Sequence, residues 1–297
     1  MRGCNYMSAD CANRVDQWQE LGFEERFRTT KEELALMRET GYNTVRLIPE
    51  YVVWKEEHDG FMERFERYIA VCHEYGISCM IVLANDCMPP KTELWKMPYI
   101  GEQSYDWGYH GGRKHSQHGS HNGPAPHFYL DEENSREDYF CMVREIVTKY
   151  KDDERICVWD VYNEPGNSRR RDITLPNLKK LFEILREISP SQPLTCAVFS
   201  MKGDENIPLS LPEQYALDNS DIISYHFYGD YTEHIKLIKR LKKQGRPIMN
   251  TEWLGRCFGN DIFSLFPLFY LERIGCYNWG FVAGKYQTYE PWESTWE

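Results

Sequence analysis

Eight short apolar runs divide this chain, and segments with helical periodicity separate most of them. The runs cover residues 2–7, 43–48, 78–84, 156–162, 194–199, 222–227, 247–251 and 276–281. Strands that alternate with helices are typical of βα units around a parallel sheet. Eight such units predict an α/β fold, a single (β/α)8 TIM barrel, with residues 1–297 forming one domain.

Capping and stop signals locate the helices between these runs. Thr30 and Glu33 form a capping-box pattern that predicts a helix start, and Gly41 predicts the end of that helix. Ser135 is the expected N-cap of another helix, and Pro176 suits a first helical turn. Further helices are expected at 61–75, 211–217, 234–243 and 262–274. The chain after the eighth run is aromatic and polar rather than amphipathic, so the last barrel helix is expected to be short or missing.

Charge and composition exclude several classes of partner. The chain has 35 Lys and Arg against 46 Asp and Glu, a net charge of −11, which argues against nucleic acid or an anionic membrane. No stretch approaches the roughly 18 apolar residues that span a bilayer. The ten cysteines show no regular spacing and predict free thiols, with Cys4 and Cys11 the one pair close enough in sequence for a disulfide. With no apolar signal region at its start, the chain is expected to be cytoplasmic; a trimmed N-terminus would instead predict secretion.

Polar and ionisable residues stand where these apolar runs end. The active site of a parallel barrel lies at the carboxyl ends of its strands, so these residues are the candidate site. They are Arg46, Asn85, Asp86, Asn163, Glu164, His226, Tyr228, Glu252 and Trp279.

Two of these residues are glutamates, Glu164 after the fourth run and Glu252 after the seventh. Their strands lie on opposite sides of the barrel mouth, so the two carboxyls are expected to converge. Glycosidases that retain anomeric configuration place two carboxyls about 5–5.5 Å apart, whereas inverting enzymes need about 6.5–9.5 Å. A pair on the fourth and seventh strands suits the shorter distance, which predicts a retaining glycosidase.

Five segments in order resemble clan A glycoside hydrolases, most nearly the cellulase and mannanase type of family 5. They are the runs 41–46 (Gly-Tyr-Asn-Thr-Val-Arg), 158–165 (Val-Trp-Asp-Val-Tyr-Asn-Glu-Pro), His226-Phe227-Tyr228, 247–253 (Pro-Ile-Met-Asn-Thr-Glu-Trp) and Trp279. The resemblance extends from about residue 3 to residue 279. It implies a β-glycoside hydrolase that acts by double displacement through a covalent glycosyl-enzyme.

The resemblance also implies a role for each matching residue. Glu164 would be the acid/base and Glu252 the nucleophile, with Asn163 bound to the sugar 2-hydroxyl. Arg46 and Tyr228 would hold Glu252 ionised, because a cation and a hydroxyl donor both favour a carboxylate. His226 would lie near the acid/base, and Trp279 would form the floor of the −1 subsite. Many family 5 members carry a histidine after the third strand, where this chain has Asn85-Asp86-Cys87, so the choice among glucan, mannan and xylan stays open.

The long connection at 86–134 is rich in Gly, Pro, His and aromatic residues. Connections of this length in a compact domain are usually functional or disordered. Its histidines fit no compact zinc pattern, which predicts no metal site and favours a lid over the substrate. Trp107, Tyr109 and Tyr129 are its candidate stacking platforms, and a lid at one end of the cleft would favour exo-action. The histidines are His110, His115, His118, His121 and His127.

Two other classes of protein remain to be weighed. Metal-dependent barrel hydrolases typically carry a His-x-His pair on the first strand, and this chain has Cys4-Asn5-Tyr6 there. A non-catalytic carbohydrate-binding barrel of the same clan is the alternative function, although a protein that only binds needs no paired carboxylates. The expected partner is a carbohydrate substrate, no cofactor is needed, and the sequence gives no oligomeric state.

Overall fold

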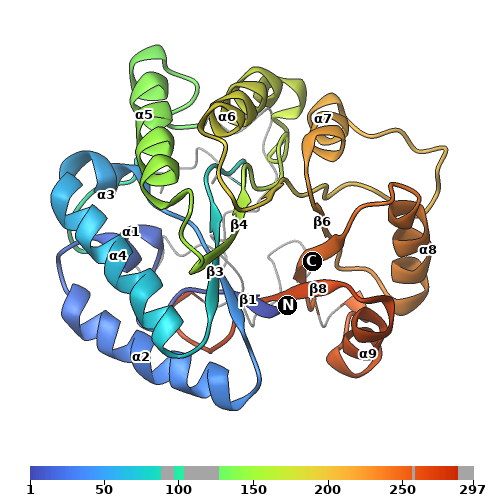
Figure 1. Cartoon of the computed structure of the whole chain (residues 1–297), viewed down its shortest axis with the longest axis horizontal. Helices are drawn as coiled ribbons and strands as arrows, with labels where there is room; N and C mark the ends of the chain where they lie inside the picture. Colours follow the sequence, from blue (N-terminus) through green and yellow to red (C-terminus); the bar gives the residue numbers. More distant parts are fainter. Residues whose placement is uncertain (88–96, 104–126, 256–257, 287–297) are drawn as a thin grey trace.

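The computed structural model describes residues 1–87, 97–103, 127–255 and 258–286, and it contains an eight-stranded parallel sheet (Figure 1). The order across the sheet is β5-β4-β3-β2-β1-β8-β7-β6. A bridge between Val198 and Tyr225 closes the barrel, because His226 N donates to Val198 O at 2.9 Å. The predicted (β/α)8 barrel is therefore confirmed. The strands are β1 (Arg2–Asn5), β2 (Thr44–Leu47), β3 (Ser78–Val82), β4 (Ile156–Asp160), β5 (Leu194–Thr195), β6 (Ile223–His226), β7 (Ile248–Trp253) and β8 (Gly275–Trp279).

Helices surround the strands in Figure 1. Two short helices that the sequence did not predict, α1 and α3, flank the predicted ones in the first third of the chain. No helix follows β8 as far as residue 286, and the rest of the C-terminus lies outside the described residues. The helices are α1 (Arg14–Trp18), α2 (Phe23–Glu39), α3 (Tyr51–Glu56), α4 (His58–Glu74), α5 (Glu133–Tyr150), η2 (Arg171–Thr174), α6 (Leu175–Ile188), α7 (Leu211–Asn219), α8 (Tyr231–Lys242) and α9 (Ile262–Glu272).

The predicted start of α2 is wrong, although its end is correct. The helix begins at Phe23, so Thr30 and Glu33 lie inside it. Thr30 Oγ1 donates to a carbonyl of the preceding turn, and the Glu33 carboxylate accepts a hydrogen bond from Tyr6 OH at 2.7 Å. Thr30 therefore bonds within the helix and Glu33 bonds to Tyr6, the residue after β1, so neither side chain caps a helix end. Gly41 follows the helix with φ +89°, a conformation that glycine adopts without steric cost.

Other boundaries differ from the prediction for local reasons. The N-cap of α5 is Glu132, and Ser135 Oγ donates to a carbonyl of the preceding segment. The predicted strand at 194–199 is shortened to β5, since its end contacts β6 only at the Val198 bridge. In contrast, β7 extends to Trp253, so Glu252 lies within the strand. Pro176 lies in the first turn of α6, as predicted.

The barrel interior has an apolar floor formed by Met80, Val158, Met249 and Tyr277. The Tyr277 ring occupies the space beside Gly3, where a Cβ would lie 2.4 Å from the ring. Thr44 on β2 contacts Tyr277. Arg46 lies two residues further along the same strand and begins a polar layer. The alternation of side chains along a strand thus separates the packed floor from the polar mouth.

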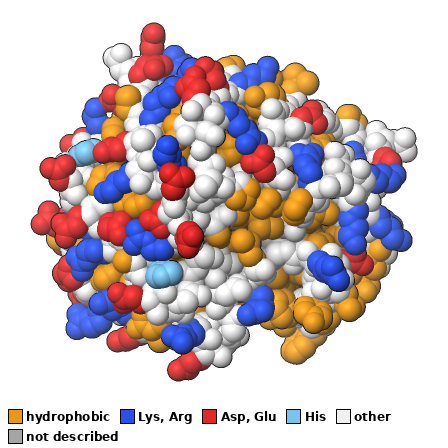
Figure 2. Space-filling view, in the orientation of Figure 1, with side chains coloured by type: hydrophobic (Ala, Val, Ile, Leu, Met, Phe, Trp, Pro, Cys, Tyr) orange, Lys and Arg blue, Asp and Glu red, His pale blue; other side chains and the backbone are white. Residues whose placement is uncertain are grey.

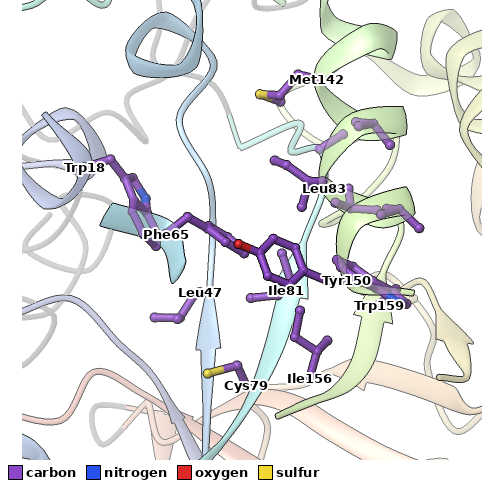
Figure 3. Packing of buried hydrophobic residues seen from close by; sticks show 14 of the residues in the cluster. Trp18, Leu47, Phe65, Cys79, Ile81, Leu83, Met142, Tyr150, Ile156 and Trp159 are labelled. Carbon is purple, nitrogen blue, oxygen red and sulfur yellow. The ribbon is translucent and has the colours of Figure 1, made fainter. Parts of the chain in front are cut away.

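A large aromatic cluster fills the space between the sheet and its outer helices (Figure 3). Trp18 is fully buried and stacks on Phe65 with ring centroids 5.6 Å apart. Tyr68 lies 4.9 Å from the same indole, and Tyr150 packs on Phe65 at 5.3 Å. This packing fixes α1, α4 and α5 relative to the strands whose ends carry the site.

The surface differs from one helix to the next (Figure 2). Charged side chains of both signs gather over α2, α4 and α5, whereas hydrophobic side chains gather over α9, where Phe263 and Tyr270 are largely exposed. Among the described residues, no helix has the length and hydropathy that crossing a bilayer requires. All nine cysteines in the described part of the chain, Cys4 and Cys11 included, are free thiols.

Candidate active site

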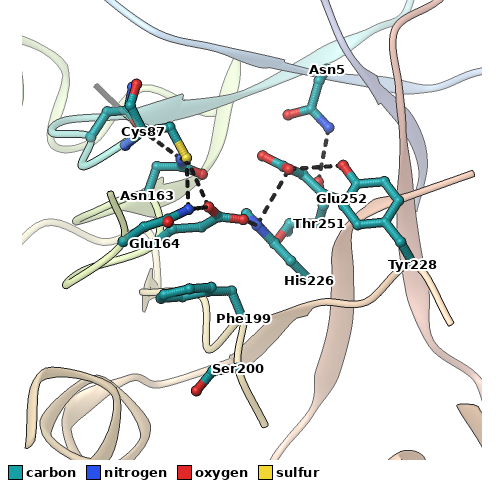
Figure 4. A network of polar contacts seen from close by, with 12 residues as sticks. Asn5, Cys87, Asn163, Glu164, Phe199, Ser200, His226, Tyr228, Thr251 and Glu252 are labelled. Carbon is teal, nitrogen blue, oxygen red and sulfur yellow. Dashed lines mark hydrogen bonds and ion pairs between the residues drawn. The ribbon is translucent and has the colours of Figure 1, made fainter. Parts of the chain in front are cut away.

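Two glutamate side chains converge at the carboxyl ends of β4 and β7 (Figure 4). Glu164 follows β4 directly after Asn163, Glu252 lies near the end of β7, and both are buried. One carboxylate oxygen from each glutamate and one ring nitrogen of His226 lie within 4.8 Å of one another. The structure therefore brings together the two carboxyls that the sequence assigns to opposite sides of the barrel mouth.

Glu252 accepts hydrogen bonds from Arg46 on β2 and from Tyr228 just after β6. Arg46 Nη1 donates to Oε1 and Tyr228 OH donates to Oε2, each at 3.0 Å, while His226 Nδ1 lies 3.4 Å from Oε2. Burial has the strongest influence and raises the pKa of Glu252. His226 lowers this pKa, the charge of Glu164 raises it, and Arg46 and Tyr228 lower it. The cation and the phenol both favour the ionised carboxylate, which offsets part of the cost of burying it.

Arg46 organises the polar layer of the barrel from β2. Its side chain is fully buried and donates twice to Asp160 Oδ2 on β4, at 2.7 and 3.0 Å. The same guanidinium donates to Asn5 Oδ1 on β1 and to Asn163 Oδ1, both at 2.7 Å. With the bond to Glu252, one side chain links four strand ends, and its two carboxylate partners compensate its buried charge.

Glu164 is held by groups from other segments. His226 Nδ1 on β6 lies 2.6 Å from Oε1, and Cys87 Sγ lies 2.7 Å from Oε2. Asn167 Nδ2, three residues further along the chain, also donates to Oε2. Burial raises the pKa of Glu164, but His226 and then the donors Cys87 and Asn167 outweigh it and lower the pKa to about 2. These contacts therefore favour the ionised form of the Glu164 carboxylate.

Asn163, the residue before Glu164, connects this part of the site to the segment after β3. Its Nδ2 donates to Asn85 Oδ1 at 2.7 Å, and the two residues form an isolated parallel bridge. Because its Oδ1 accepts from Arg46, the amide orientation is fixed on both sides. Nδ2 also donates to Cys87 Sγ at 3.6 Å, a long contact with a weak acceptor.

A cleft of about 600 Å³ opens above the two glutamates. Trp279, half-buried at the end of β8, forms part of its wall, as Asn85, Asn163, His226 and Tyr228 do. Trp107 lies outside the described residues. Aromatic and charged side chains complete the wall, among them Phe199, Lys202, Phe227, Glu233 and Phe258.

Two described residues of the long connection do not belong to a lid. His127 is buried, and its Nδ1 accepts a hydrogen bond from Leu130 N at 3.1 Å. Tyr129 packs in the core with its ring 4.3 Å from that of Tyr51, which corrects its assignment as a stacking platform. Its position in the core follows from the aromatic pocket that α3 and α5 form there. Tyr109 and the other four histidines of the connection lie outside the described residues.

The sequence missed four residues that shape the site. Asn5 and Asp160 are polar residues inside apolar runs, which is the same pattern that identified Arg46. Applied to every strand position, that pattern would have found them. Cys87 and Asn167 lie in loops, and nothing in their sequence neighbourhoods indicates that they contact a carboxylate.

The cluster of Glu164, His226 and Glu252 also has the spacing of a three-ligand metal site. However, the contacts of these groups to Arg46 and Tyr228 place a cation and a donor where an ion would compete for the Glu252 carboxylate. Hydrolysis of a glycosidic bond by two carboxyls requires no metal. The expectation that no metal or cofactor is needed stays a prediction.

Comparisons with known proteins agree with this geometry. A family model described as cellulase, glycosyl hydrolase family 5, matches residues 9–262. A search of curated protein sequences finds no match.

Solved structures share the fold at low sequence identity. A β-mannanase from the blue mussel Mytilus edulis is 12% identical, with 97% of this chain and 89% of that chain covered and a TM-score of 0.62. A family 5 mannosidase from Rhizomucor miehei in complex with mannosyl-fructose is 13% identical, with 94% and 80% covered and a TM-score of 0.58. Thermotoga maritima Cel5A in complex with cellobiose is 14% identical, with 89% and 86% covered and a TM-score of 0.53. Since the family model matches most of its length, the chain belongs to glycosyl hydrolase family 5 and is a glycoside hydrolase.

Proposed function

We propose that this enzyme hydrolyses β-glycosidic bonds in oligo- or polysaccharides with retention of configuration. Glu252 is the nucleophile and Glu164 the acid/base. The observation that carries the proposal is the approach of the two carboxylates, with oxygens within 4.8 Å of each other. This close approach suits the separation of about 5–5.5 Å between the carboxyl groups of retaining enzymes better than the about 6.5–9.5 Å of inverting enzymes, which leaves room for a water.

The reaction follows from the contacts of the two glutamates. In the first step Glu252 attacks the anomeric carbon while Glu164 gives its proton to the glycosidic oxygen, and the bond between that carbon and oxygen breaks. In the second step Glu164 removes a proton from water, and the water oxygen displaces Glu252. Arg46 and Tyr228 stabilise the charge that returns to Glu252 when it leaves.

The acid/base role requires that Glu164 carry a proton when substrate is bound. Its Oε1 lies 2.6 Å from His226 Nδ1, within hydrogen-bond distance. A sugar that fills the cleft displaces water from the carboxylate, and desolvation favours the neutral acid. Substrate binding therefore raises the pKa of Glu164 and makes it a proton donor.

Substrate contacts are assigned to neighbouring side chains. The weakly held amide hydrogen of Asn163 suits the sugar 2-hydroxyl, a contact that strengthens as the transition state forms. The Trp279 ring offers a flat apolar face for the sugar in the −1 subsite. Substrates are β-linked glycans of the glucan, mannan or xylan type, and structural neighbours with names such as β-mannanase and β-glucosidase support this range.

A trapping experiment tests the proposal directly. The protein is incubated with activated 2-deoxy-2-fluoro β-glycosides of gluco, manno, xylo, galacto and cellobiosyl configuration, and its intact mass is recorded. We expect one sugar adduct on the peptide that contains Glu252 and none in the Glu252→Gln variant. An adduct on another residue, or inverted products from a natural glycan, would overturn the assignment.

A further inference from the structure

Three consecutive residues beyond the end of β3, residues 85–87, contact Glu164 and the residues beside it. Asn85 Oδ1 accepts from Asn163 Nδ2 at 2.7 Å. Asp86 is fully buried, and its Oδ2 accepts from Gly166 N at 2.7 Å. Cys87 Sγ lies 2.7 Å from Oε2 of Glu164 itself. Three consecutive residues therefore hold three successive parts of the acid/base loop.

Cys87 acts as a hydrogen-bond donor in this contact. Burial raises the pKa of the Cys87 thiol well above its usual value, and the charge of Glu164 raises it further, so the sulfur keeps its hydrogen. An ionised carboxylate can only accept hydrogen bonds, so the S–H group donates to Oε2. Asn167 Nδ2 donates to the same oxygen and lies 3.2 Å from the sulfur, which fixes the three groups relative to one another.

The two oxygens of Glu164 consequently have different surroundings. Oε2 faces Cys87 and Asn167, two neutral donors. Oε1 faces His226, whose Nδ1 also lies 3.4 Å from Glu252, so Oε1 is the oxygen on the side of the nucleophile. A glycosidic bond attacked by Glu252 must lie on that side.

We propose that Cys87 is a positioning residue for the acid/base, whose S–H group fixes Oε2 of Glu164 so that Oε1 exchanges the proton with the substrate. The inference rests on the proposed function of Glu164. When Oε1 gives its proton to the glycosidic oxygen, the new carboxylate keeps the S–H bond, which is stronger to a charged acceptor than to a neutral one. The thiol therefore stabilises the transition state in which the leaving group departs.

Removal of the S–H donor should change the protonation of Glu164. The titratable groups that face this carboxyl are His226 from β6, Glu252 from β7 and Tyr228 after β6, and the last two also interact electrostatically with Cys87. A carboxylate that loses a donor has a higher pKa. The limb of the kcat/KM profile that reports the acid should accordingly move to higher pH in Cys87→Ala.

The test compares Cys87→Ala with Cys87→Ser, which keeps a donor, and with Cys141→Ala, which removes an exposed thiol on α5. kcat/KM is measured over pH for aryl β-glycosides whose leaving groups range from dinitrophenol to phenol. For phenol we expect Cys87→Ala to lose about 10- to 100-fold, the usual effect of a hydrogen bond to a charged group. For dinitrophenol, which needs no proton, the loss should be under about threefold. Cys87→Ser should recover most of the activity, and Cys141→Ala should match the wild type.

An equal loss for all leaving groups, or an unshifted pH profile, would show a structural role for Cys87 and overturn the inference. An infrared measurement, which needs no turnover, tests the role of Cys87 separately from the proposed function. The infrared S–H stretching band that disappears in Cys87→Ala should lie at low frequency and move upward in Glu164→Gln. If the frequency of this band does not change in Glu164→Gln, the inference is contradicted even if the enzyme is active. If the band shifts as expected but the fluoro-sugars label no residue, only the proposed function is contradicted.

Discussion

The surroundings of Glu252 and Glu164 differ in kind. Glu252 lies within the extended backbone of β7 and is bound by the cation of Arg46, which reaches it from β2. Glu164 lies just beyond β4 with φ +47°. His226 on β6 contacts its Oε1, while its Oε2 is bound by the neutral donors Cys87 and Asn167, both in loops. Glu252 is thus placed by a strand and bound by a cation, whereas one oxygen of Glu164 depends on neutral donors from loops.

The largest effects should separate the two glutamates by leaving group. Glu252→Gln should lower kcat/KM at least about 10⁴-fold on every substrate, because no other group can form the covalent intermediate. Glu164→Gln should lose about 10²- to 10⁴-fold with phenol as leaving group and far less with dinitrophenol, from which it should release one equivalent in a burst. Stopped-flow release of each phenol measures both.

Azide provides the control for this pair of variants. It should restore turnover of a dinitrophenyl glycoside by Glu164→Ala and yield the β-glycosyl azide, because the small anion needs no general base. With Glu252→Ala the product should be the α-glycosyl azide. Exchanged products would mean that the two roles are assigned the wrong way round.

Arg46 tests the charged side of the comparison. Arg46→Met leaves Asp160 buried without its cation, and unpaired buried charges cost about 3–5 kcal/mol. Urea unfolding should show this loss, and the fluoro-sugar should label Glu252 more slowly. The double variant Arg46→Met/Asp160→Asn removes the stranded charge and should recover much of the stability but not the labelling rate. Recovery of both would reduce Arg46 to a structural role.

The strand-borne half of the site could be predicted from the sequence. A strand places alternate residues on one face, and parallel strands end at the same rim, so Arg46 and Glu252 could be located without coordinates. The same reasoning located Asn163 and His226. Helix α2 shows the limit, because the capping-box pattern of Thr30 was overridden by an earlier helix start at Phe23.

The loop residues that hold Glu164 could not be predicted. Cys87 contacts Glu164 from a loop in which the preceding residue, Asp86, binds the backbone of the Glu164 loop. Asn167 lies in a turn with several left-handed residues, including Ser168. These contacts depend on loop conformations, which no periodicity specifies. The polar residues Asn85 and Asp86 were visible at the strand end, but their partners were not.

The Glu252 side of the barrel should weaken at acidic pH. His234 on α8 is buried against Phe227 and Phe269, and its Nε2 faces the amide donor of Asn260 at 3.1 Å. Burial lowers the pKa of His234 to about 4. Because the folded-state pKa lies below the unfolded value, the contribution is complete above about pH 6.5 and is lost as the pH falls toward 4, in total roughly 3 kcal/mol.

Urea unfolding from pH 7.5 to 4 measures this loss. His234→Gln cannot be protonated, so its free energy of unfolding should fall less steeply than that of the wild type over that range. An NMR titration of the His234 ring should give a midpoint far below 6.5 in the folded protein. An ordinary midpoint would show that this side of the barrel tolerates the charge.

The smallest effect should come from the backbone of the Glu164 loop. Gly166 has φ +92°, and a Cβ there would lie 3.0 Å from the carbonyl oxygen of Arg171. Gly245 after α8 has φ +68° with nothing within 4 Å, so it serves as the matched control. The left-handed conformation alone costs about 1 kcal/mol in Gly245→Ala, and the added contact should bring Gly166→Ala to about 2 kcal/mol.

Activity distinguishes these two glycine variants more sharply than stability does. Gly166 N donates to Asp86, and a displaced loop would move Glu164 relative to Cys87. Gly166→Ala should therefore lose activity on phenyl glycosides while its rate of labelling by activated fluoro-sugars, which depends on Glu252, stays close to that of Gly245→Ala. If activity on phenyl glycosides and the labelling rate fell together, the substitution would affect Glu164 and Glu252 equally. That result would contradict the contrast between a nucleophile held by a strand and an acid held by loop residues.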